Sequence, residues 1–216
     1  MSKTPVTIGF LLALAAGALA AQRVASPAEL KQAEHDVPLL TEILELKPGM
    51  TVADVGAGFG QMTIVLSRWI GPKGRIYATD LGAPQLTALR EAVTREHLEN
   101  VVVLESAERA TNLPDACCDA IFLRDVYHHV TQPEPFDRSL AASLKPGGRL
   151  AVIDFPPTSG SKLPGGVPEN RGGHGVPPAV VVSELSAQGL THVKTIPVWP
   201  PDTDPSRFFL VLFRKP

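Results

Sequence analysis

Residues 51–60 restrict the fold of this chain more than any other segment. A mostly β-branched and apolar run, residues 51–55, leads directly into glycines at positions 56, 58 and 60. In the segment that follows, apolar side chains recur at the spacing of one helical face, at Met62, Val65, Leu66 and Trp69. The pattern predicts a buried strand, a tight glycine turn and a helix. Unpaired backbone N–H groups of the turn and of the helix N-terminus are then available to a ligand that binds at the end of the strand.

The spacing of the glycines separates two kinds of nucleotide site. A dinucleotide-binding turn follows G-x-G-x-x-G, which places the third glycine where this chain has Gln61. Here the glycines follow G-x-G-x-G, and Asp54 stands two positions before the first of them. A pyrophosphate needs the later glycine so that the helix can pack close to it. The spacing therefore favours a nucleoside ligand without phosphate, and a glycine turn in an unrelated α/β protein is the alternative.

Residues 54–60, Asp-Val-Gly-Ala-Gly-Phe-Gly, resemble motif I of the class I S-adenosylmethionine-dependent methyltransferases. The resemblance extends over residues 47–213 and includes the Leu-Lys-Pro-Gly-Gly turn at residues 144–148. It implies S-adenosylmethionine as the cofactor and a Rossmann-like α/β fold, with a doubly wound seven-stranded mixed sheet, the last strand antiparallel and helices on both faces. It also implies that the glycine turn contributes the cofactor-binding residues Asp54, Gly56, Ala57, Gly58 and Gly60.

Two further strand ends are expected to complete the cofactor site. Residues 75–80 are predicted to form the next strand, and Asp80 at its end can accept hydrogen bonds from the ribose hydroxyls. Asp80 could instead cap the helix after it. After a strand over residues 100–104, the family commonly has an Asp that binds the adenine amino group. This chain has Ser106 there, so Ser106, the Ala107 backbone or Glu108 is the predicted adenine contact.

The fourth predicted strand, residues 118–124, is followed by Asp125, Tyr127, His128 and His129. Ligands of open α/β sheets bind at the carboxyl ends of such central strands. By its position, Asp125 should hold the amino-acid end of the cofactor. We predict that one histidine, His128 ahead of His129, orients or deprotonates the methyl acceptor, with Tyr127 beside it.

Adjacent residues on a turn point apart, so His128 and His129 are not both expected to reach one acceptor. The alternative is that one histidine caps a helix and the other packs in the core. Metal ligation is the least favoured role for this pair, and we predict no metal site.

The later part of the chain is expected to close the acceptor side of the site. A strand over residues 150–155 brings Asp154 to the same edge of the sheet. Residues 156–178 are rich in proline and glycine and contain Arg171 and His174. A loop of this length in a compact domain is usually functional, and we interpret it as a substrate lid. Asp154 and His174 are secondary candidates for a catalytic role. A helix over residues 179–188 and an antiparallel pair, residues 191–198 and 207–213, complete the fold.

The first twenty residues have the pattern of a secretory signal peptide. Lys3 precedes an apolar run over residues 6–19, and Ala18-Leu19-Ala20 fits a small-x-small cleavage site. Cleavage after Ala20 predicts a secreted or periplasmic protein. The alternative is an uncleaved N-terminal anchor, which would place the protein on a membrane.

Between the signal peptide and the domain, residues 21–46 are predicted to form a helical segment that covers the cofactor. Ser26 is a candidate N-cap, with a proline after it and Glu29 three residues later. A second helical stretch is expected over residues 38–46. The methyltransferase domain itself is predicted to cover residues 47–216.

Composition limits the choice of partners. The chain has 216 residues, enough for one domain with a sizeable core, and 19% of them are charged. Its formal net charge of −2 leaves no basic surface for nucleic acid, so none is expected as a partner. The two cysteines are neighbours and provide no disulfide framework. The sequence indicates no particular oligomeric state.

Together these features predict an enzyme that transfers a methyl group from S-adenosylmethionine to a small molecule by in-line displacement. The Tyr-His-His sequence after the fourth strand and the proline-rich stretch are similar to a branch of small-molecule enzymes akin to the quinone-biosynthesis methyltransferases. Two alternatives remain. One is a binding module for adenosyl ligands without catalysis. The other is a nicotinamide-dependent dehydrogenase, which Gln61 disfavours.

Overall fold

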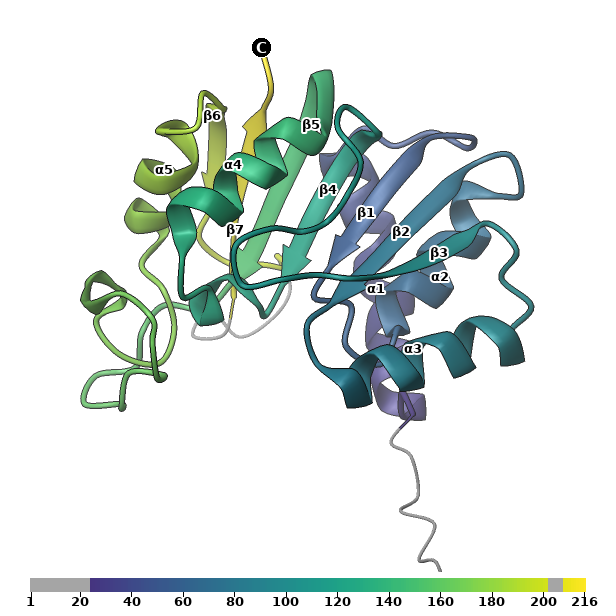
Figure 1. Ribbon diagram of the computed structural model, residues 1–216, viewed down its shortest axis with the longest axis horizontal. Helices are drawn as coiled ribbons and strands as arrows, with labels where there is room; N and C mark the ends of the chain where they lie inside the picture. Colours follow the sequence, from purple (N-terminus) through teal and green to yellow (C-terminus); the bar gives the residue numbers. More distant parts are fainter. Residues whose placement is uncertain (1–23, 202–207) are drawn as a thin grey trace, which may run out of the picture.

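The computed structural model describes residues 24–201 and 208–216 (Figure 1). The predicted signal peptide and its cleavage site lie outside the described residues, as does the part of the last connection from residue 202 to 207. None of the described helices is both long enough and apolar enough to cross a membrane.

One seven-stranded sheet forms the centre of the molecule, in the order β3-β2-β1-β4-β5-β7-β6. All neighbouring strands pair in parallel except β7, which runs antiparallel to both β5 and β6. The predicted fold class is confirmed, including the antiparallel last strand. The strands are β1 (Thr51–Val55), β2 (Arg75–Asp80), β3 (Val101–Glu105), β4 (Cys118–Arg124), β5 (Leu144–Asp154), β6 (Thr191–Ile196) and β7 (Phe209–Arg214).

Helices cover both faces of the sheet (Figure 1). On β4, Phe122 points into a core that includes Leu40 and Leu66 of the first two helices. The alternate residue Ile121 points into the opposite core, which includes side chains of the last two helices. This alternation is the period-two pattern of a strand buried on both faces. The helices are α1 (Pro27–Ile43), α2 (Gln61–Ile70), α3 (Ala83–Arg95), α4 (Pro133–Ser143) and α5 (Pro178–Ser186), with short 3-10 turns η1 (Tyr127–His129) and η2 (Glu169–Arg171).

The N-terminal segment differs from the prediction of two helical stretches. Ser26 and Glu29 form the expected capping box, but the helix that they begin runs without a break through Pro38 to Ile43. Pro38 is exposed, while Val37 and Leu40 beside it are buried. Burial of those side chains outweighs the hydrogen bond that a proline removes from a helix interior. The segment is therefore part of the core of the domain, and none of its described residues, 24–46, lines the cleft described below.

Two local expectations were also wrong. Trp69 was predicted on the buried face of α2, yet it is 36% exposed. The buried face of the helix is wider and lies elsewhere, because it includes Ile64 and Ile70 as well as Met62 and Leu66. The predicted turn over residues 145–149 lies within the bounds of β5 as an irregularity in its pairing with β4. Local spacing could not show either feature, since both depend on elements distant in sequence.

Candidate functional site

The carboxyl ends of β1, β2 and β4 meet at one edge of the sheet, where they border a cleft of about 390 Å³. Figure 1 shows the arrowheads of β1 and β4 side by side at this edge. The volume lies within the usual range of a small-molecule site. Its walls come from the turn after β1, the residue at the end of β2, the segment after β3 and the segment after β4. Predicted cofactor residues on these walls are Gly56, Gly58, Asp80, Ser106, Ala107 and Asp125.

The glycine turn is folded back onto the neighbouring strand. The backbone N–H groups of Gly56 and Ala57 both donate to the Thr79 carbonyl oxygen, at 2.8 and 2.9 Å. A Cβ atom on Gly56 would lie 2.4 Å from a methyl group of Val126, so packing requires glycine there. A Cβ atom on Gly58, whose φ is +57°, would meet nothing within 4 Å. Gly58 therefore leaves its space to a ligand in the cleft.

The Asp80 carboxylate is held by backbone groups from two sides. Its Oδ2 accepts the Gly58 N–H at 2.9 Å, and its Oδ1 accepts the N–H groups of Leu81 and Gly82 at 2.8 and 3.1 Å. This side chain thus stabilises the turn before α3, whereas α3 itself has Gly82 as its N-cap and no side-chain cap, so Asp80 does not cap the helix. A carboxylate offers about four lone-pair sites, so three backbone bonds leave capacity for a ligand hydroxyl.

Asp54 supports the turn from beneath. Its side chain is buried and accepts a hydrogen bond of 2.6 Å from the Thr63 hydroxyl of α2. Burial raises the pKa of the Asp54 carboxyl to about 7, and the Asp80 carboxylate acts in the same direction. Like Ala57 and Gly60, Asp54 does not line the cleft. The structure therefore places these three predicted residues where they shape the turn.

The predicted adenine contacts lie on the wall opposite the glycine turn. Ser106, Ala107 and Glu108 line the cleft, and the Ser106 N–H donates to the Asp80 carbonyl oxygen at 2.9 Å. Asp125 lines it from the end of β4, with a left-handed φ of +63° that aspartate tolerates better than most residues. Their contacts with a cofactor stay predictions.

Three histidines gather at the end of the cleft beside Asp125. The ring centroids of His128 and His129 lie 4.0 Å apart, and that of His174 lies 5.0 Å from the first and 5.7 Å from the second. The expectation that the adjacent histidines point apart was wrong, because the 3-10 turn brings their rings together with an interplanar angle of 44°. His129 lines the cleft and is exposed, whereas His128 is 2% exposed.

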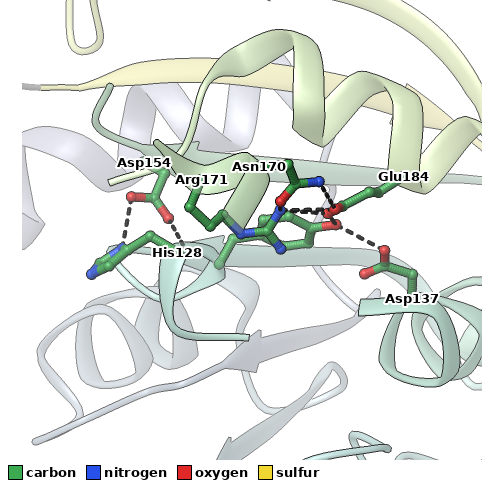
Figure 2. Close-up of polar contacts among 7 residues, drawn as sticks. His128, Asp137, Asp154, Asn170, Arg171 and Glu184 are labelled. Carbon is green, nitrogen blue, oxygen red and sulfur yellow. Dashed lines mark hydrogen bonds and ion pairs between the residues drawn. The ribbon is translucent and has the colours of Figure 1, made fainter. Parts of the chain in front are cut away.

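Asp154, at the end of β5, fixes the orientation of His128. Its Oδ2 accepts the His128 backbone N–H at 3.0 Å, and its Oδ1 lies 2.9 Å from His128 Nδ1 (Figure 2). Burial lowers the pKa of His129 below its ordinary value of 6.5, and the neighbouring imidazoles of His128 and His174 lower it further. His129 is therefore a neutral imidazole at pH 7, with a lone pair for a proton or a ligand.

Comparison with known proteins agrees with this geometry. Residues 53–152 match the family described as "Methyltransferase domain". A SAM-dependent methyltransferase from Aquifex aeolicus has 28% identity and a TM-score of 0.63, with 88% of this chain and 98% of that chain covered. Residues 53–152 thus match a methyltransferase domain, and the chain as a whole is similar in sequence and fold to an S-adenosylmethionine-dependent methyltransferase.

Among curated relatives of this chain are two ubiquinone/menaquinone biosynthesis C-methyltransferases. The protein of Pseudomonas paraeruginosa is 30% identical over 56% of this chain and 48% of its own length. That of Escherichia fergusonii is 33% identical over 51% of this chain and 44% of its own. This chain thus spans about half the length of the curated relatives it matches. The [4+2]-cyclase SpnF shares the fold, with a TM-score of 0.69, 18% identity, and 86% and 82% of the two chains covered.

Tyr127 occupies a different place from the one predicted. It is fully buried, and its hydroxyl lies 2.8 Å from Asp137 Oδ2 and 2.9 Å from Glu184 Oε2. A phenol has a single proton, so one of these contacts requires a protonated carboxyl. Burial raises the pKa of Asp137 to about 7, which lets it supply that proton. The structure does not bring the Tyr127 hydroxyl to the cleft of the methyltransferase.

Sequence reasoning missed the rest of this network. Arg171, from the proline-rich loop, is fully buried, and its Nη1 contacts both carboxylate oxygens of Glu184 at 2.8 and 3.0 Å. Figure 2 shows these groups meeting on the side of Arg171 away from His128. The network ties the loop to α4 and α5, which fixes one end of the segment that carries His174. An arginine in a loop is usually exposed, so its residue type gave no signal of this burial.

Replacing Asp80 with alanine is expected to weaken S-adenosylhomocysteine binding by about 1.5–3 kcal/mol, or roughly 10- to 150-fold, the range for a hydrogen bond to a charged group. The reason is the loss of an acceptor for the ribose and of the Gly58 N–H contact. Calorimetry measures the change, with Asp115→Ala, an exposed carboxylate away from the cleft, as the control. Unchanged affinity in Asp80→Ala would assign Asp80 to the turn alone.

Proposed function

We propose that this methyltransferase transfers the methyl group of S-adenosylmethionine to a small aromatic acceptor that binds beside the three histidines. The observation that carries the proposal is a cleft lined both by Gly58, where the turn has open space, and by His129, a neutral imidazole. One wall suits an adenosyl ligand and the adjoining wall suits a reacting group.

The residues present fit the cofactor. A Cβ atom at Gly58 would occupy the cleft, so this position suits close approach of a ligand to the backbone. Gly58 and Asp125 would hold the amino-acid end, Asp80 the ribose, and Ser106 or Ala107 the adenine. When bound, the cofactor supplies an electrophilic methyl carbon. The chain's main contribution is then to align the acceptor and exclude water, which accounts for most of the acceleration in such a displacement.

The acceptor side combines apolar walls with imidazole. Val130 and Phe136 line the cleft, and the Phe155 ring lies 4.7 Å from the His128 ring. His129, exposed in the cleft, is positioned to take the proton of an acceptor, while Asp154 and His128 form a fixed support behind it. Apolar walls with one polar group suit a phenol or hydroquinone. The names of the quinone-biosynthesis relatives support the same acceptor class.

Cofactor choice provides the first test. We expect S-adenosylhomocysteine to bind and NAD not to bind, because the third glycine of a dinucleotide turn is replaced by Gln61. Calorimetry with both ligands measures this directly. NAD binding without affinity for the adenosyl ligand would overturn the proposal. Adenosyl binding without turnover on a panel of phenols, hydroquinones and thiols would favour the alternative of a non-catalytic binding module.

We further propose that the protein is exported. The support is Lys3, the apolar run over residues 6–19 and the Ala18-Leu19-Ala20 site. N-terminal sequencing of the secreted or periplasmic fraction is expected to begin at Ala21. An intact Met1 found only in the cytosol would contradict export, whereas Met1 in the membrane fraction would indicate an uncleaved anchor.

A further inference from the structure

The three histidines at the end of the cleft come from two segments that are distant in sequence. His128 and His129 form the 3-10 turn after β4, and His174 comes from the proline-rich loop. One ring nitrogen of each lies within 4.8 Å of those of the other two. One buried and two exposed imidazoles from distant segments thus bring three nitrogens, a ligand type that divalent transition metals prefer, to one place.

His128 has the environment of a metal ligand. Its Nδ1 contacts the Asp154 carboxylate at 2.9 Å, which leaves Nε2 as the nitrogen free to bind (Figure 2). Asp154 itself is fixed by the backbone N–H groups of His128 and Phe155, at 3.0 and 2.8 Å. A carboxylate that orients a histidine from behind in this way is the usual support of a metal-bound imidazole.

The other two histidines are free to adjust. His129 and His174 are both exposed, so their side chains can rotate without breaking the core. The backbone of His174 is nevertheless held in place: its N–H donates to Ser161 Oγ at 2.8 Å, and its carbonyl accepts the Thr158 N–H at 3.3 Å. Tetrahedral ligands at 2.0–2.1 Å from a zinc ion lie about 3.3 Å apart. The nitrogens, within 4.8 Å of one another, must approach more closely to bind one ion, and the two exposed rings have the freedom to rotate.

We propose that His128, His129 and His174 bind one divalent transition metal ion of the class that prefers imidazole, with Zn²⁺ as the reference ion. Three histidines leave the fourth tetrahedral position open, as in catalytic zinc sites. Of the three ligands, His129 lines the cleft. A metal ion there would lower the pKa of a bound hydroxyl or thiol group. The sequence had predicted no metal site, because only two of the three ligands are adjacent in the chain.

A metal ion bound to His129 would occupy the lone pair that the proposed function assigns to proton abstraction. Metal binding is therefore tested by itself, without a methyl acceptor. The untagged protein is stripped with a chelator, dialysed and titrated with Zn²⁺ by calorimetry and with Co²⁺ by visible absorption. We expect one ion per chain and the intense absorption of tetrahedral cobalt. His129→Ala and His174→Ala should each weaken binding by at least about the 10- to 100-fold that removal of a supporting carboxylate costs.

His192→Ala is the matched control, because His192 is an exposed histidine on β6, outside the cluster. It should leave metal affinity unchanged. S-adenosylhomocysteine affinity, measured on each variant, reports whether the fold survives. Absence of stoichiometric Zn²⁺ binding, or equal affinities in His174→Ala and His192→Ala, would overturn the metal site. Metal binding in a protein that binds no adenosyl ligand would leave the site standing while the proposed function fails.

Discussion

Gly58→Val is expected to abolish S-adenosylhomocysteine binding in calorimetry while the protein remains folded. Gly58 lines the cleft and its Cβ position has nothing within 4 Å, so we expect the valine side chain to occupy the space of the ligand. The substitution also strains the backbone of the folded protein. The φ of residue 58 is +57°, and this left-handed conformation costs a β-branched residue about 1–2 kcal/mol. That cost affects stability, whereas the steric overlap affects binding.

Gly49→Val separates these two effects. Gly49 also has a positive φ, +91°, and open space at its Cβ position, but it lies before β1, at the end of the strand away from the cleft. The two variants should lose similar stability in thermal unfolding, and only Gly58→Val should lose the ligand. Retained binding in Gly58→Val would place the adenosyl ligand elsewhere and would remove the basis for cofactor use at this cleft.

Much of the fold could be predicted because its signals are local. The nearly continuous apolar run of β4 and the turn residues around β2 appear directly in the sequence, and the observed bounds of both strands agree with the predicted ones. The glycine turn could be predicted in the same way, since glycine is the residue that adopts positive φ values most readily and the three glycines do so at positions 56, 58 and 60. In each case the residues that determine the structure lie within a few positions of one another.

The site was less predictable because its decisive contacts are long-range. Tyr127 stands next to the histidines in the sequence, but its hydroxyl meets Asp137 and Glu184 of the helices that cover the sheet. His174 is separated from His129 by the whole of α4 and β5, yet their rings lie 5.7 Å apart. Residue type and spacing can nominate such groups. Only the packing of the loop, fixed by buried Arg171, decides which of them meet.

His129→Ala is expected to reduce turnover by about 10²- to 10⁴-fold, the usual contribution of a positioned proton acceptor, with nearly unchanged affinity for S-adenosylhomocysteine. His129 is the exposed member of the pair and lines the cleft, so it can touch the acceptor. His128 is buried against Asp154 and acts through its neighbours. Sequence reasoning placed His128 first, and the structure favours His129. Initial rates of His128→Ala and His129→Ala measure the contribution of each histidine, with His192→Ala as the control.

The pH dependence gives this prediction a second readout. Proton abstraction needs a neutral imidazole, so the rate should rise with pH through the pKa of His129 and then level off. Because burial and the neighbouring imidazoles lower that pKa from 6.5, the rising limb should lie below pH 6.5 and the plateau should include pH 7. The limb should disappear in His129→Ala and persist in His192→Ala. If His129→Ala keeps wild-type turnover and the same profile, the imidazole is structural and alignment of the acceptor alone accounts for the rate.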